Sequence, residues 1–460
     1  MHFLHRATWL RSAAGIATLL VLLSDGAAAE AAPPLLARID VPEFLSSFPL
    51  PVYAQLRDAA GQDYVLVQAD LADLNDGGWP FRILDSAAAN YVLAVEFRQG
   101  ARAAAAQDGF SIIHDDGRRL VVRSASPGDD IEALGLLGFQ CRRLPDFPMN
   151  LDRPVRAGAA NLPKAAISSN AWVSEMVASI QQTNLYVALS ELTGAQPAVA
   201  GGSYTNIRSR HQNSGAGVRR ATELAYEHFH ALGLQPSYQA WSASGMSNRN
   251  VIGTLPGTTA SSEIVVVCAH IDDMPSGATA PGADDNASGS VAVFAAAEAL
   301  RRFSFERTLR FVLFTGEEQG LYGSDAHAAA ADAAGDNLVA VLNLDMVAWD
   351  GNGDKVLNLY VRPGNASELD AAATLTNVVR VYGLGGGVVP VVVQETVDWS
   401  DHYSFNAYGF PAICLIEEDV ADFNPYYHTT NDVLARLNMP FFTHATKAVA
   451  GAAAHLARPV

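Results

Sequence analysis

Six acidic and histidine side chains in the C-terminal two-thirds of the chain are of the types that hold catalytic metal ions. They lie in five short motifs, C-A-H-I-D, P-G-A-D-D-N-A-S-G, T-G-E-E-Q-G, N-L-D-M and N-P-Y-Y-H-T-T, and are His270, Asp284, Glu317, Glu318, Asp345 and His428. Imidazole and carboxylate ligands without cysteine are typical of hydrolytic zinc sites. Each motif alone is common in turns or on solvated surfaces, so the prediction rests on their joint occurrence. Together they predict two zinc ions per chain.

The spacing within the motifs suggests how these side chains divide the work. His270 and Asp272 are two residues apart, so in extended backbone they face the same way and Asp272 can support a metal-bound imidazole. The D-D-N turn offers a carboxylate that can bridge two ions. Glu317 and Glu318 are adjacent and point in different directions. One of them can therefore bind metal while the other acts as a general base.

The elements around these motifs predict an α/β fold, with a mainly parallel sheet flanked by helices. Strand-like runs at 263–268, 308–314 and 338–344 are rich in Val, Ile and Leu, which is typical of parallel strands buried on both faces. In such sheets ligands gather beyond the carboxyl ends of the strands, where His270, Glu317 and Asp345 are expected. Further strands are expected at 356–361, 388–394 and 411–416, and helices at 171–191, 216–232, 288–303, 367–382 and 440–457.

A chain of 460 residues is too long for one ordinary domain, so two are expected. Residues 36–150 contain β-like runs and turn-rich patches but no metal-like or nucleophile cluster. They predict a small α+β N-terminal unit, an accessory domain or pro-domain. Prolines at 145, 148, 154 and 163 are typical of a linker, expected over 151–165 and open to cutting. The catalytic domain is expected over 166–460.

The first residues have the pattern of a removed signal peptide. Arg6 and Arg11 precede an apolar run over 13–23, and Ala27, Ala28 and Ala29 are small residues suited to cleavage. The run is shorter than the ~18–20 residues that a spanning helix needs. We therefore expect removal of residues 1–29, and a secreted or periplasmic protein without a membrane partner afterwards.

The bulk composition narrows the classes of partner. A net charge of −18 argues against nucleic acid, because phosphate binding needs a basic surface. Three cysteines, Cys141, Cys268 and Cys414, are too few for a disulfide scaffold and are expected to be buried as small hydrophobes. A bridge between Cys268 and Cys414 requires that their strands be neighbours. The sequence carries no signal for an oligomeric state.

At these motifs, over roughly residues 166–460, the chain resembles the M28 family of zinc metallopeptidases, whose secreted members are co-catalytic di-zinc aminopeptidases. The resemblance implies that peptides are trimmed from a free N-terminus, with the substrate α-amine against one zinc. It implies that Asp284 bridges the ions, that Glu317 is the general base and acid, and that Asp272 orients His270. The terminal zinc ligands it implies are His270, Glu318, Asp345 and His428.

The chain departs from the family pattern near Ser400-Asp401-His402. Val397 stands where secreted bacterial members carry a tyrosine that assists the tetrahedral intermediate, and Glu395 and Trp399 replace a flanking cysteine pair. Other donors are then expected, and the candidates are Tyr403, Tyr426 and Tyr427.

Three other readings compete with a di-zinc aminopeptidase. A glutaminyl cyclase shares the fold and similar ligands, but the intact Asp284 and the Glu317–Glu318 pair favour a peptidase. A carboxypeptidase-type or dipeptide specificity stays open, because metal ligands do not decide which chain end is held. A binding protein without metal is disfavoured by the complete set of ligands.

Overall fold

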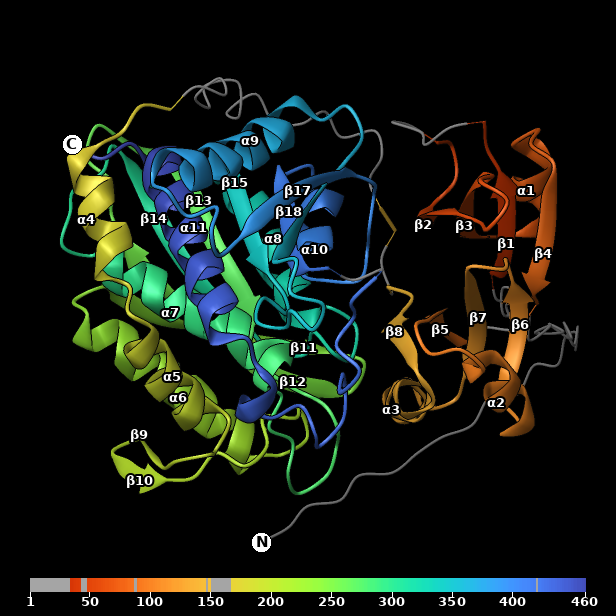
Figure 1. The fold of residues 1–460 in the computed structure, drawn as a ribbon. Coiled ribbons are helices and arrows are strands. Elements are labelled where there is room, and N and C mark those ends of the chain that lie inside the picture. Colours follow the sequence, from red (N-terminus) through yellow and green to blue (C-terminus); the bar gives the residue numbers. More distant parts are fainter. Residues whose placement is uncertain (1–33, 43–47, 87–88, 146–147, 150–166, 419–420) are drawn as a thin grey trace, which may run out of the picture.

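The computed structural model describes residues 34–42, 48–86, 89–145, 148–149, 167–418 and 421–460. Outside these residues lie the expected signal peptide over 1–29 and the expected linker over 151–165. Figure 1 shows an N-terminal unit of strands and short helices beside a larger unit in which helices flank a central sheet. No helix among the described residues is long and apolar enough to cross a membrane.

The larger unit is built on one eight-stranded sheet. Four neighbouring strands in its centre run parallel, whereas a hairpin at one edge and the pairing next to the other edge are antiparallel. This confirms the predicted α/β fold with a mainly parallel mixed sheet. In spatial order the strands are β11 (Gln235–Ala243), β12 (Met246–Leu255), β14 (Arg307–Phe314), β13 (Ala260–His270), β15 (Asn337–Leu344), β18 (Ala412–Glu417), β16 (Val356–Val361) and β17 (Val389–Gln394).

Helices cover both faces of this sheet. Along β13, Val265 and Val267 belong to one apolar cluster while Val266 and Cys268 belong to another. Both faces are therefore buried, which explains why the strand is apolar without interruption. The first cluster includes residues of α4 (Ala171–Ser179), α5 (Gln182–Leu192), α6 (Ala216–Ala231), α7 (Gly289–Leu300), α9 (Ala366–Val381) and α11 (Met439–Ala457), and the second includes residues of α8 (Tyr322–Ala334) and α10 (His402–Ala407).

The N-terminal unit contains two four-stranded antiparallel sheets, in the orders β2-β3-β1-β4 and β6-β7-β5-β8. The second sheet and its two helices follow a β-α-β-β-α-β order, a split βαβ motif. Its edge strand β8 lies toward the larger unit (Figure 1). The elements are β1 (Leu35–Asp40), β2 (Val52–Arg57), β3 (Asp63–Ala69), α1 (Leu71–Asp76), β4 (Phe81–Asp85), β5 (Asn90–Glu96), α2 (Ala101–Gln107), β6 (Ser111–Asp115), β7 (Arg119–Ser124), α3 (Pro127–Leu137) and β8 (Phe139–Arg143).

The three cysteines are buried free thiols. Cys268 lies on β13 and Cys414 on β18, and β15 runs between these two strands. The bridge considered from the sequence is therefore not formed. The amide of Asn343 on β15 lies between the two sulfur atoms instead, with its oxygen 3.6 Å from Cys268 Sγ and its nitrogen 3.8 Å from Cys414 Sγ.

Candidate active site

Three parallel strand ends bring acidic and imidazole groups together at one edge of the large sheet. His270 is the last residue of β13, the pair Glu317 and Glu318 follows β14, and Asp345 follows β15. His270 Nε2 lies 3.3 Å from Asp345 Oδ1 and 3.9 Å from Glu317 Oε2. All four residues are buried. The sequence prediction that these residues meet at one sheet edge agrees with this geometry.

The carboxylate that joins the two imidazoles belongs to Asp285, the neighbour of the predicted Asp284. Asp285 Oδ1 lies 3.4 Å from His270 Nε2, and its Oδ2 lies 3.1 Å from His428 Nε2. His428 Nε2 also lies 2.8 Å from Glu318 Oε2. The two oxygens of Asp285 thus face two separate groups, which is the arrangement expected of a bridging ligand.

Asp284 points away from the imidazoles. Its Oδ1 accepts a hydrogen bond from the Ala348 amide at 3.0 Å, and its Oδ2 accepts one from Asn424 Nδ2 at 2.8 Å. Burial raises the pKa of Asp284 to about 6 and raises the pKa of its neighbour Glu417 well above the usual range. The bridging role expected for Asp284 therefore does not fit its position. Consecutive residues in this non-helical turn project their side chains to different sides, and Asp285 has φ −103° and ψ 96°.

Hydrogen bonds to main-chain groups hold the turn that presents Asp285. The Asp432 carboxylate accepts from the amides of Asp284 and Asp285 at 3.0 Å each. Asn286 donates to Leu344 O at 2.9 Å and accepts from the Gly289 amide at 2.9 Å. At Gly289 a Cβ atom would lie 2.5 Å from Asn286 Oδ1, so that position requires glycine. The N-A-S-G part of the motif is therefore explained by the turn, and Asp432 is a supporting residue that the sequence did not reveal.

Arg210 also stabilises this turn, through hydrogen bonds to main-chain carbonyl groups. No sequence motif pointed to this residue. Its side chain is fully buried and donates to Ile271 O at 2.8 Å and to Pro281 O and Gly282 O at 2.9 Å each. Its guanidinium lies 3.2 Å from the Asp273 carboxylate. Arg210 thus joins the segment after His270 to the segment before Asp285.

Asp272 supports this centre through both its backbone and its side chain. Its carbonyl oxygen lies 3.2 Å from His270 Nδ1, while its Oδ1 lies 3.8 Å from the same nitrogen. Oδ1 also accepts a hydrogen bond from the Glu317 amide at 3.4 Å. The predicted support of the His270 ring therefore comes first from the main chain of Asp272.

The spacings of the donor atoms suit zinc ligands. Ligand atoms bound at ~2.0–2.1 Å to one tetrahedral ion lie about 3.3 Å from one another. His270 Nε2, Asp345 Oδ1 and Asp285 Oδ1 form one group, with N–O separations of 3.3 and 3.4 Å. His428 Nε2, Glu318 Oε2 and Asp285 Oδ2 form the other, with separations of 2.8 and 3.1 Å. Glu318 Oε1 is buried without a hydrogen-bond partner among the described residues, as expected of an atom that lacks a cation.

The electrostatics of this cluster also favour cations. Four buried carboxylates, of Asp285, Glu317, Glu318 and Asp345, face only two imidazoles. Burial raises the pKa of Glu317 well above its usual range and that of Glu318 to about 7. Burial alone lowers the pKa of His428, but the charges of Glu318 and Asp285 raise it to about 10. An excess of buried negative charge is costly unless a metal ion compensates it.

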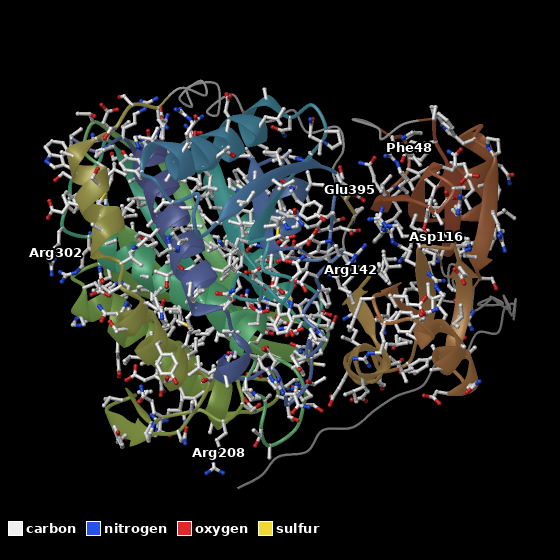
Figure 2. The ribbon with its side chains drawn as sticks, viewed as in Figure 1. Phe48, Asp116, Arg142, Arg208, Arg302 and Glu395 are labelled. Carbon is white, nitrogen blue, oxygen red and sulfur yellow. The ribbon has the colours of Figure 1, made fainter. Side chains whose placement is uncertain are left out.

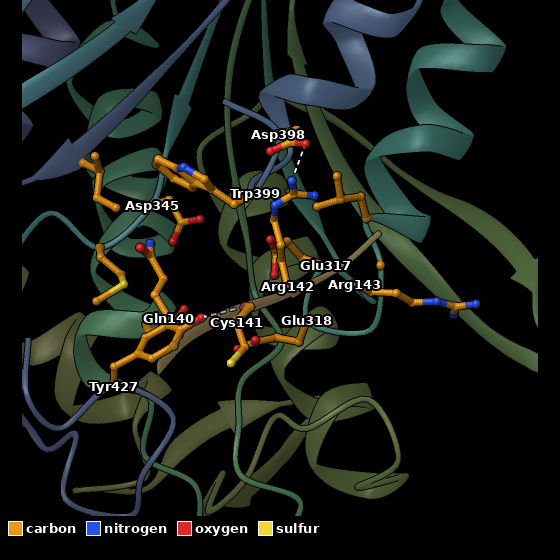
Figure 3. A pocket seen from close by; sticks show the side chains of 15 residues that line it. Gln140, Cys141, Arg142, Arg143, Glu317, Glu318, Asp345, Asp398, Trp399 and Tyr427 are labelled. Atoms are coloured by element: carbon orange, nitrogen blue, oxygen red, sulfur yellow. Dashed lines mark hydrogen bonds and ion pairs between the residues drawn. The ribbon is translucent and has the colours of Figure 1, made fainter. Parts of the chain in front are cut away.

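The N-terminal unit contributes to the walls of this centre. Four β8 residues, 140–143, line one pocket together with the acidic residues 285, 317, 318 and 345 (Figure 3). The remaining cavity measures about 30 Å³, room for a few water molecules at most. The other wall is apolar and comes from Met346, Trp399, Ile416 and Tyr427.

Of the three candidate tyrosines, Tyr427 is the one that reaches this pocket. Its hydroxyl donates to the carbonyl of Cys141 at 3.3 Å. Tyr403 is fully buried and donates to the carbonyl of Tyr53 at 3.2 Å, whereas the Tyr426 ring stacks below the guanidinium of Arg436. Tyr427 is therefore the candidate donor nearest the acidic centre.

Comparisons with known proteins relate the larger unit to metallopeptidases. The model of peptidase family M28 matches residues 250–453. A "Probable leucine aminopeptidase" of Trichophyton verrucosum is 30% identical over 308 residues, which cover 64% of this chain and 77% of that protein. "Leucine aminopeptidase 1" of Arthroderma gypseum is also 30% identical over 308 residues, covering 62% of this chain and 77% of the relative.

Solved structures show the same fold. The LapA aminopeptidase of Legionella pneumophila superposes with a TM-score of 0.58 at 21% identity, covering 80% of this chain and 98% of that one. LapB of the same organism gives a TM-score of 0.58 at 17% identity, with coverage of 80% and 99%. The 80% of this chain that each structure covers is more than residues 167–460 make up. The similarity of fold therefore extends into the N-terminal unit.

Proposed function

Because the chain belongs to peptidase family M28 and is a zinc-type metallo-aminopeptidase, we propose that it uses two zinc ions and Glu317 to remove N-terminal residues from peptides. The observation that carries the proposal is the pair of ligand groups joined by Asp285. One group is His270, Asp345 and Asp285 Oδ1, and the other is His428, Glu318 and Asp285 Oδ2. We assign one ion to each group.

Bound zinc supplies a Lewis acid that polarises a carbonyl group and favours ionisation of water. Among the four carboxylates, Glu317 lies farthest from the imidazoles, with its Oε2 3.9 Å from His270 Nε2. It also lines the pocket. Burial raises its pKa well above the usual range, so this carboxylate takes up a proton more readily than an exposed one does. Glu317 accordingly takes the proton of the attacking water and returns it to the departing amine.

Two supporting residues keep these groups in place. Asp272 holds the His270 ring through its carbonyl oxygen at 3.2 Å and the Glu317 amide through its side chain at 3.4 Å. Tyr427 offers a hydroxyl at the pocket wall for the developing oxyanion, in place of the tyrosine that Val397 replaces. An oxyanion donor of this kind contributes about 10²–10³ in rate.

Cleavage from the N-terminus is favoured over the alternatives by the relatives, which are named leucine aminopeptidases. The test is release of p-nitroaniline from leucine p-nitroanilide and from its N-acetyl derivative, before and after chelation. We expect chelator-sensitive hydrolysis of the free-amine substrate alone. Equal hydrolysis of both, or cyclisation of N-terminal glutamine, would contradict the proposal.

The location and processing of the chain are part of the same proposal. Residues 1–29 have the pattern of a secretory signal, and residues 36–150 are proposed as a pro-domain cut within 151–165, where Arg153, Arg156 and Lys164 offer basic cleavage sites. Mass spectrometry of the exported protein tests both steps. A chain that starts at Met1, or one that keeps residues 36–460 joined in the active form, counts against them.

A further inference from the structure

We propose that β8 occupies the substrate groove of the larger unit, called the catalytic unit below. We also propose that Arg142 takes the place of a cationic substrate side chain, which would bind Asp398. This inference rests on the proposed function and adds two points to it. The N-terminal unit acts as a built-in competitor of the substrate. Once β8 has left the groove, the enzyme selects peptides with lysine or arginine among their first two residues.

The backbone of β8 has the form of a bound peptide. It is the edge strand of its sheet, so its outer edge is turned toward the catalytic unit. Extended peptides are recognised through such main-chain edges. The main chain of Cys141 accepts a hydrogen bond from Tyr427, and residues 140–143 lie against Glu317 and Glu318 in one pocket. A peptide substrate needs this same space.

Arg142 reaches from β8 to Asp398 on the opposite wall (Figure 3), where the two side chains form a close ion pair. Both side chains are almost fully covered, with exposed fractions of 12% and 4%. Asp398 lines the same pocket as Glu317 and Asp345. Arg142 therefore lies in the catalytic centre and not at the rim of the interface.

The cations around Asp398 come from the N-terminal unit. Burial raises the pKa of Asp398, and the groups that oppose this shift are Arg142 and Arg119. Among the residues that the structure describes, Arg142 is the one ion-pair partner of Asp398. When β8 leaves, the catalytic unit keeps a carboxylate on its pocket wall, and an incoming guanidinium or ammonium group can replace Arg142.

Other contacts join the two units outside the pocket. Glu132 accepts from Ser276 Oγ at 2.7 Å, and Arg118 lies 3.2 Å from Glu395. Figure 2 shows Glu395 on the side of the larger unit that faces the N-terminal unit. On α3, a Cβ atom at Gly135 would lie only 3.3 Å from the Cβ of His428, so this helix packs closely on a proposed zinc ligand. The Arg118–Glu395 pair provides a control, because it joins the two units without lining the catalytic pocket.

The test compares the intact wild-type chain with R142A, R142A/D398N and the control R118A. The substrates are hexapeptides that carry arginine or its neutral isostere citrulline at position 1 or 2. We expect R142A to raise kcat/KM at least tenfold on all peptides, whereas R118A changes it less than twofold. In R142A, arginine is preferred to citrulline by about tenfold at one of the two positions. In R142A/D398N this preference is lost, whereas the raised rate on citrulline peptides persists.

The inference fails in two ways that differ from failure of the proposed function. If R142A and R118A raise the rate equally, β8 is not a competitor in the groove. If the preference for arginine is absent or survives D398N, Asp398 is not its determinant. Folding of each variant is checked by its melting temperature. If no variant cleaves any free-amine peptide, and limited proteolysis restores nothing, the peptidase assignment itself fails.

Discussion

Asp284 and Asp285 are consecutive residues, but their carboxylates contact different groups. Asp285 Oδ2 lies 3.1 Å from His428 Nε2, whereas Asp284 Oδ2 lies 2.8 Å from Asn424 Nδ2. We predict that D285N loses zinc, because the ligand shared by both groups is weakened. D284N keeps both ions with affinity reduced about 10–100-fold, as for other residues that support ligands indirectly. Zinc content after dialysis distinguishes the two variants, and equal losses would contradict the assignment.

Replacement of Glu317 by glutamine separates chemistry from metal binding. Glutamine keeps the size of the side chain but cannot take up the proton, so E317Q should lower kcat by about 10²–10⁴. Its zinc content should equal that of the wild type. Turnover close to normal in E317Q would show that another group is the general base.

Removal of zinc should destabilise the folded chain, because four buried carboxylates then face only two imidazoles. A ligand present at a thousand times its Kd stabilises a protein by ~4 kcal/mol, which corresponds to about 5–10 °C in melting temperature. A chelator should lower the melting temperature of the wild type by this amount and leave that of D285N unchanged. An unchanged wild type would argue against resident metal.

Acid should weaken the fold through His327, which lies among Phe314 and Phe405. Burial lowers the pKa of His327 to about 3, with Arg310 as a smaller cause. In the unfolded chain its pKa is about 6.5. Between these values the unfolded state binds more protons, so stability present above about pH 6.5 is lost as the pH falls toward 3.

The H327N variant tests this linkage. Asparagine cannot be protonated, so the urea midpoint of H327N should fall less between pH 7 and pH 5 than that of the wild type. The control is H230N, which removes an exposed histidine instead of a buried one. Identical pH dependence in H327N and wild type would show that this group does not carry the effect.

Arg210 should be among the most sensitive positions outside the centre. R210M removes the guanidinium that pairs with Asp273, and breaking a buried ion pair costs about 3–5 kcal/mol in the free energy of unfolding. R210K keeps the charge but cannot reach the carbonyls of Ile271, Pro281 and Gly282 together, so it should be intermediate. Urea denaturation measures both. A loss below 1 kcal/mol in R210M would contradict the role given to this residue.

The sequence predicted the parts of the fold that depend on periodicity. The apolar run at 263–268 lies within β13, and the expected helix at 440–457 is α11 over Met439–Ala457. The expected helix over 171–191 is two helices, because Ile180 and Gln181 have extended backbone. The hairpin β11–β12 and helix α8 were missed. The exposed, polar side of β11 and the many alanines of α8 give weak periodic patterns.

At the proposed site, the sequence motifs pointed to the side chains that cluster, except that Asp285 takes the place expected of Asp284. They could not separate Asp284 from Asp285, because that choice depends on the backbone angles of a single turn. They also gave no sign of Arg210 or Asp432, which act on main-chain groups far away in sequence. The pairing of Arg142 with Asp398 was equally hidden, because it depends on how two separate units meet.

Anomalous X-ray diffraction at the zinc absorption edge, from crystals of the intact chain, would locate the metal ions relative to Asp285. We predict two peaks on either side of the Asp285 carboxylate, one beside His270 and Asp345 and the other beside Glu318 and His428. A single peak, or a peak ligated by Asp284, would contradict the account.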